Sequence, residues 1–161
     1  MKALFAILLL IAVLIQDAPA LAKPSNASPL IGSWAVDVSR LPIPPTARPK
    51  SVTITFGDAG NGKWATQVDI VDGGGTKSHA EGTASLDGTA APVKGSPEAD
   101  VTAVKMPAPN VLVMQLGKDG MPASTRVYTI AADGESMIEI AAYFGDGGVP
   151  VMRTNYFTRV R

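Results

Sequence analysis

The sequence predicts an all-β fold, an up-and-down antiparallel β-barrel of eight to ten strands. Five Asp-Gly dipeptides punctuate the chain, at residues 72–73, 87–88, 119–120, 133–134 and 146–147. Asp-Gly favours the type I′ turn of a β-hairpin, because both central residues of that turn need a positive φ. Between the turns, apolar and polar residues alternate as in half-buried strands, and no long helical pattern follows the N-terminal apolar run.

The predicted strands follow one another with short connections. The first, at residues 30–38, is followed by a loop at residues 39–50 whose four prolines exclude a central strand. Further strands are expected at residues 51–56, 63–71, 77–86, 100–106, 111–116, 125–130, 136–144 and 149–160, with a short one at 89–93. Because nearly every later connection is short, a barrel is favoured over a Greek-key sandwich, which needs long crossovers.

The N-terminus predicts export. Lys2 precedes an apolar run at residues 3–15, and Ala20-Leu21-Ala22 has the form that a signal peptidase cleaves. We expect a signal peptide at residues 1–22, a disordered leader at 23–29 and one barrel domain at 30–161, in the periplasm or secreted. The apolar run is shorter than the roughly 20 residues that span a bilayer, so no integral membrane span is expected.

Charge and cysteine content exclude several classes of function. Removing residues 1–22 takes away one basic and one acidic residue, so the mature chain keeps a formal net charge of zero. A neutral chain offers no basic field for nucleic acid. The chain has no cysteine, so neither disulfides nor a cysteine-ligated zinc site can stabilise it.

Arg126 and Tyr128 are the candidate ligand-binding residues. One residue separates them, so they share a face of the strand at 125–130. A guanidinium can hold a carboxylate with two hydrogen bonds and a tyrosine hydroxyl can add a third, an arrangement similar to that of fatty-acid-binding barrels. The alternative is an outward Arg126 that only covers a strand face. Arg153, Tyr156 and Arg159 could serve instead, although Arg153 and Tyr156 fall on opposite faces.

No catalytic residue, metal site or cofactor is predicted, and the protein is expected not to be an enzyme. His79 and Glu81 share a strand face, but one histidine and one carboxylate make an incomplete site and a solvated pair is favoured. Residues 57–63 have the spacing of a phosphate-binding loop. Trp64 stands where that motif needs Ser or Thr, and a hairpin turn explains the glycines.

Four segments carry a resemblance to known proteins: Gly32-Ser33-Trp34, residues 49–54, residues 86–88 and residues 92–100. With these segments, the chain resembles a family of small exported bacterial proteins with a lipocalin-like barrel and no settled function, and the similarity covers most of residues 30–161. The segments are turn and strand signals, so the resemblance implies a fold and no activity. It also implies that Trp34 packs across the closed end of the barrel.

Two functions remain open at this point. The first is a non-catalytic barrel that binds a small hydrophobic or amphipathic ligand, in a cavity lined by Met106, Met114, Met137 and Met152. The second is a structural or interaction protein of the cell envelope, with a core filled by Phe56, Trp64, Tyr128 and Phe144. The volume of the interior distinguishes them.

Overall fold

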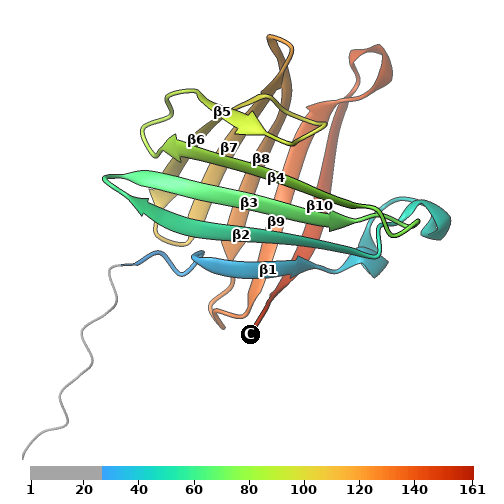
Figure 1. Ribbon diagram of the computed structural model, residues 1–161, viewed down its shortest axis with the longest axis horizontal. Helices are drawn as coiled ribbons and strands as arrows, with labels where there is room; N and C mark the ends of the chain where they lie inside the picture. Colours follow the sequence, from blue (N-terminus) through green and yellow to red (C-terminus); the bar gives the residue numbers. More distant parts are fainter. Residues whose placement is uncertain (1–26) are drawn as a thin grey trace, which may run out of the picture.

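The chain folds into a closed barrel of ten antiparallel strands, which confirms the predicted all-β architecture (Figure 1). The computed structural model describes residues 27–161, so the predicted signal peptide lies outside the described residues. The strands are β1 (Gly32–Val36), β2 (Ser51–Gly60), β3 (Lys63–Val71), β4 (Lys77–Ser85), β5 (Ala91–Lys94), β6 (Val101–Ala108), β7 (Val111–Lys118), β8 (Met121–Ile130), β9 (Ser136–Phe144) and β10 (Pro150–Arg159). Each pairs with its neighbours in the chain, and β1 pairs with β10 to close the barrel.

Three short 3₁₀ helices lie in the connections. They are η1 (Val38–Arg40), η2 (Pro45–Ala47) and η3 (Asp146–Gly148). All three lie at the same end of the barrel, where β1 and β9 end and β2 and β10 begin. We call this end the mouth. In the described part of the chain, no helix is long and apolar enough to cross a membrane.

The opposite end of the barrel is closed around Trp34. Its ring is fully buried, and its Nε1 donates to the carbonyl of Leu30 at 2.8 Å. The Arg159 guanidinium lies over the ring, 4.1 Å from its centroid, and donates to the carbonyls of Pro29, Ile31 and Gly134. Through this cation–π contact and three hydrogen bonds, Arg159 of β10 holds together Trp34 of β1, the residues that precede β1 and the β8–β9 turn.

Aromatic side chains fill the half of the interior nearest the closed end. Phe56 packs against Trp64 with ring centroids 5.6 Å apart and against Tyr128 at 5.1 Å, and Tyr128 reaches Phe157 at 6.3 Å. These residues alternate with outward side chains along their strands, as the period of two requires. The core predicted from Phe56, Trp64 and Tyr128 therefore exists, but it occupies this half only.

Phe144 and Met152 were expected inside the barrel, and both expectations are wrong. Each has 71% of its surface exposed. Phe144 pairs with Pro150 and Met152 with Ala142, so both lie on the outward face of the β9–β10 hairpin near the mouth. The alternation on this hairpin places the neighbouring Tyr143 and Arg153 inward instead.

The start of the domain also differs from the prediction. Ser28 and Pro29, assigned to the disordered leader, contact the barrel: the Ser28 hydroxyl donates to the carbonyl of Pro109 at 2.6 Å. Pro29 accepts the hydrogen bond from Arg159 described above. The predicted short strand at 89–93 is β5, shifted to Ala91–Lys94, and it has two registered residue pairs with β4 and two with β6.

Only one of the five Asp-Gly dipeptides forms the predicted turn with two positive φ angles. Asp119 and Gly120 have φ of 50° and 76°, and Asn61-Gly62 forms a second such turn. In the Asp72, Asp87 and Asp133 turns, the carboxylate instead accepts backbone N–H groups two to four residues later. This local bond holds the aspartate at negative φ.

Candidate functional site

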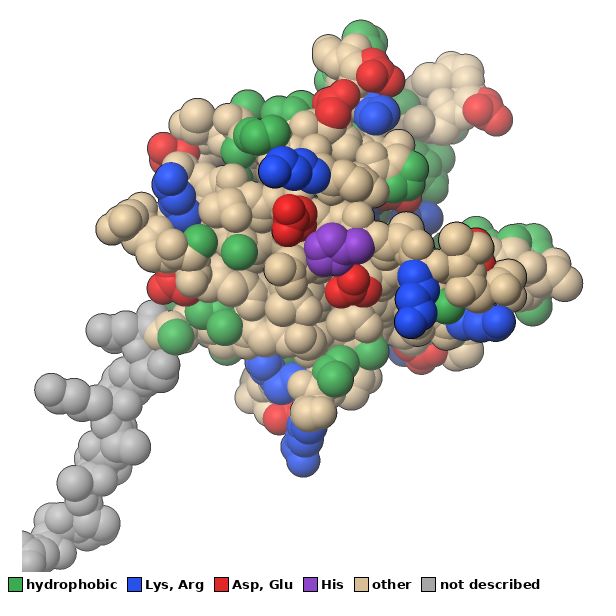
Figure 2. All heavy atoms as spheres, viewed as in Figure 1, with side chains coloured by type: hydrophobic (Ala, Val, Ile, Leu, Met, Phe, Trp, Pro, Cys, Tyr) green, Lys and Arg blue, Asp and Glu red, His purple; other side chains and the backbone are tan. Residues whose placement is uncertain are grey.

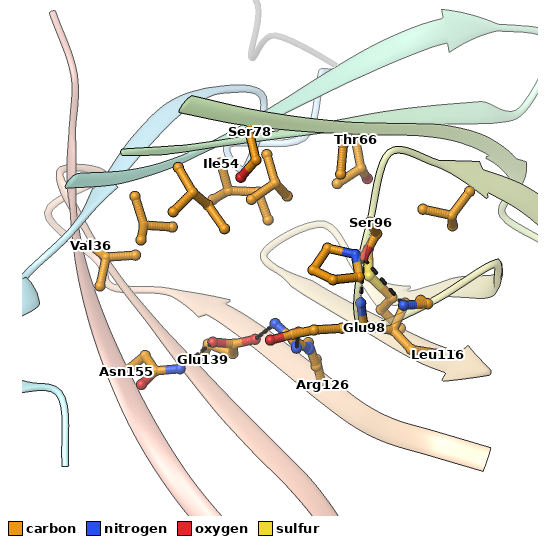
Figure 3. Close-up of a pocket in the computed structure, with 18 of the residues that line it drawn as sticks. Val36, Ile54, Thr66, Ser78, Ser96, Glu98, Leu116, Arg126, Glu139 and Asn155 are labelled. Carbon is orange, nitrogen blue, oxygen red and sulfur yellow. Dashed lines mark hydrogen bonds and ion pairs between the residues drawn. The ribbon is translucent and has the colours of Figure 1, made fainter. Parts of the chain in front are cut away.

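The half of the barrel nearest the mouth contains a cavity of about 320 Å³. One wall, from β2, β3 and β4, is largely apolar and includes Ile54, Val68 and Ala80. The facing wall, from β8, β9 and β10, is polar and carries Arg126, Glu139 and Asn155, as Figure 3 shows. The volume falls at the lower end of the roughly 300–1,000 Å³ of ordinary ligand pockets.

Strand register arranges the polar wall in two rows. Tyr128, Glu139 and Asn155 are direct partners across β8, β9 and β10, and form the deeper row. In the next row toward the mouth, Arg126 and Arg153 flank Ala141. Because the small Ala141 separates them, both long basic side chains have room on the same wall.

Glu139 is the centre of the polar wall. Its side chain is 2% exposed, and its Oε1 accepts from Arg126 Nη1 at 3.2 Å and from the Tyr128 hydroxyl at 3.0 Å. Its Oε2 accepts from Asn155 Nδ2 at 2.6 Å. A carboxylate this deeply buried is stable only when paired and hydrogen-bonded, and here both oxygens have donors.

The electrostatics keep both predicted site residues in the state that donates. Burial, together with the nearby carboxylate of Glu139, raises the pKa of the Tyr128 phenol, so the hydroxyl stays protonated. Burial alone would lower the pKa of Arg126, but the carboxylates of Glu139 and Glu98 raise it overall. Arg126 is therefore a permanent cation in the cavity wall.

A second carboxylate reaches Arg126 from a loop. Glu98, in the β5–β6 connection, places Oε2 2.5 Å from Arg126 Nη2. The Arg126 side chain is 18% exposed and that of Glu98 is 61% exposed, so this pair lies near solvent. Arg126 and Tyr128 share a strand face, as their spacing indicates, and this face points inward, so the alternative of an outward Arg126 is wrong. The carboxylates that they bind are the protein's own. Their role toward a ligand stays a prediction.

Arg153, Tyr156 and Arg159, the alternative ligand-binding residues, lie in three different parts of the barrel. Arg153 lines the cavity with its guanidinium 5.7 Å from the Tyr143 ring centroid, and no acidic side chain of the described region forms an ion pair with it. Tyr156 lies under the guanidinium of Arg40, away from the cavity lining. Arg159 belongs to the closed end. Of the three, only Arg153 contributes to the cavity.

His79 lies on the outer surface of β4. Its Nδ1 is 2.7 Å from Asp69 Oδ1 on β3, and its Nε2 is 3.9 Å from Glu81 Oε2. Figure 2 shows the histidine between two acidic side chains on an open face. The hydrogen bond with Asp69 raises the pKa of His79. All three side chains are about half exposed, which makes this a solvated cross-strand group. Residues 27–161 hold no cluster of three or more histidine and acidic side chains that could bind a metal.

Sequence reasoning missed Glu139, Asn155 and Glu98 as members of the site. The sequence could have indicated Glu139, because Glu139 lies on the same face of β9 as the buried Met137 and Ala141. A charged side chain on the buried face of a strand requires an oppositely charged or hydrogen-bonding partner inside the protein. The position of Glu98 had no such signal, since it lies in a loop whose path the alternation does not determine.

Comparison of the chain with protein-family models found no match, and comparison with curated proteins found none either.

Proposed function

We propose that the protein is an exported, non-catalytic barrel that binds a small hydrophobic or amphipathic molecule in its interior. The observation that carries this proposal is the cavity of about 320 Å³ between an apolar and a polar wall. Such a pairing suits a ligand with an apolar body and one polar end. Export rests on residues 1–22 of the sequence, which lie outside the described residues.

The distribution of core residues supports binding over the alternative of a filled structural barrel. The large aromatic side chains gather at the closed end, and Phe144, which would have helped to fill the other half, points to solvent. The cavity wall opposite Arg126 consists of medium and small side chains, including Val68 and Ala80. An interior built for packing alone would lose dispersion contacts around a void of this size.

Calorimetric titration with decanol and decanoate tests the proposal, with two Val→Phe variants for comparison. Val68→Phe adds a ring inside the cavity. Val127→Phe adds the same ring on the outward face of β8, which does not line the cavity. We expect binding to the wild type and to Val127→Phe, and loss of binding in Val68→Phe. Equal binding by both variants would contradict an interior site.

Native mass spectrometry of protein purified from its own source is the complementary experiment. A retained small molecule would identify the ligand class. A bare mass, together with no uptake of either alkyl probe, would favour the structural or interaction role instead.

A further inference from the structure

The connection between β5 and β6 forms part of the cavity lining. Residues 95–99 all line the cavity. Ala99 is buried, and the Ser96 hydroxyl oxygen accepts the backbone N–H groups of Glu98 and Ala99 at 3.1 and 3.2 Å. The loop is thus internally ordered and turned inward over the polar wall.

The side chain of Glu98 ties this loop to the polar wall through Arg126. Glu98 Oε2 forms an ion pair with Arg126 Nη2. The strand before the loop, β5, is weakly paired, with only two registered residue pairs to β4 and two to β6. The carboxylate of this pair is 61% exposed, and water that reaches it screens the attraction and reduces the free energy that the pair contributes. Glu98 is therefore a carboxylate that can leave the guanidinium easily.

The two carboxylates on Arg126 differ in how readily they exchange. Removing Glu139 from Nη1 would leave the buried donors of Tyr128 and Asn155 without an acceptor. Removing Glu98 from Nη2 returns a mostly exposed carboxylate to water. An incoming anion would therefore take the place of Glu98.

We propose that the ligand carries a carboxylate, which replaces Glu98 at Arg126 Nη2 while Glu139 stays on Nη1. The Glu98 carboxylate occupies the proposed head-group position and shows which chemical group that position can hold. The exchange keeps two carboxylates on the guanidinium, so the charge balance around Arg126 is unchanged. The alkyl part of the ligand lies against the apolar wall of β2, β3 and β4. This inference rests on the proposed function.

Decanoate and decanol, titrated by calorimetry into the wild type and two charge variants, test the exchange. Glu98→Gln removes the competing carboxylate. Glu81→Gln is the control for the change of charge, because the Glu81 side chain is similarly exposed, but it lies on the outer surface of β4 with His79 as its ion-pair partner. Both variants remove one negative charge, so a difference between them reports the local exchange.

We expect Glu98→Gln to bind decanoate about two- to fivefold more tightly than the wild type, because an exposed ion pair no longer has to open. Decanol binding stays the same in both variants, and Glu81→Gln changes decanoate binding by less than about 1.5-fold. An unchanged or weaker decanoate affinity in Glu98→Gln, or an equal gain in Glu81→Gln, would overturn the proposal.

Two outcomes separate this proposal from the proposed function. If decanol binds at least as tightly as decanoate to the wild type, the carboxylate site is wrong and the binding function stands. If neither probe binds, both fail. As an independent readout, decanoate but not decanol should shift the backbone amide NMR signals of Glu98 and Ala99, and no shift with bound decanoate would contradict displacement of Glu98.

Discussion

Replacing Glu139 by alanine tests whether the buried polar wall is held by this one carboxylate. The substitution leaves the Tyr128 hydroxyl and Asn155 Nδ2 without an acceptor, while Arg126 keeps Glu98. Each buried donor left unsatisfied costs about 1–3 kcal/mol, and breaking a buried ion pair from one side costs about 3–5 kcal/mol. We expect the free energy of unfolding to fall by about 3–5 kcal/mol, out of roughly 5–15 kcal/mol for a domain.

Urea unfolding followed by tryptophan fluorescence measures this loss, and Glu98→Ala is the control. Both carboxylates contact the same guanidinium, but Glu98 is 61% exposed and Glu139 only 2%. Removing the exposed partner should cost about 0–1 kcal/mol. Glu139→Gln, which keeps one acceptor for the tyrosine, should lie between the two alanine variants. Losses that agree within about 0.5 kcal/mol for the two alanine variants would refute the assignment of Glu139 as the buried anchor.

Three further predictions follow from other parts of the barrel. Gly95→Ala should destabilise the fold by at least about 2 kcal/mol more than Gly120→Ala in urea unfolding, since both glycines have positive φ but only at Gly95 would a Cβ lie 2.1 Å from a carbonyl oxygen; equal losses would contradict the close approach. Arg159→Lys should recover less than half of the roughly 2–4 kcal/mol lost in Arg159→Ala, because lysine cannot stack on the tryptophan and reach three carbonyls together; full recovery would argue against the fork geometry. The NMR titration midpoint of His79 should exceed 6.5 and should fall in Asp69→Asn. Since the folded pKa is raised, the stabilisation from this pair is present below pH 6.5 and is lost as the pH rises through the folded pKa; a midpoint at or below 6.5 would contradict the pairing.

The sequence predicted the strands well because their signals are local. Alternation placed Arg126 and Tyr128 on one strand face, and the structure shows that this face points into the interior. The alternation of apolar and polar residues was a less reliable guide to where each strand begins and ends. β2 continues to Gly60 through a register shift, and β8 begins at Met121, four residues before the predicted start. Backbone pairing extends strands past the residues whose side chains show the pattern.

Side-chain direction near the mouth was the main error within the fold. Phe144 and Met152 are large and apolar, and hydrophobicity alone favoured the interior. The register of the β9–β10 hairpin turns both outward, because Tyr143 and Arg153 occupy the inward positions. Residue type gives a preference for burial, whereas the pleat decides which of two neighbours is buried.

By itself, the sequence determined that this chain forms hairpin after hairpin and that Arg126 and Tyr128 share a face, since turns and alternation depend on residues a few positions apart. Only the tertiary structure decided that a cavity of about 320 Å³ remains in the open half, and that Glu139 and Glu98 meet Arg126 there. These features depend on the curvature of the closed sheet, on the register across β8, β9 and β10, and on the path of one loop. Each joins residues that are far apart in the chain, so no local pattern records them.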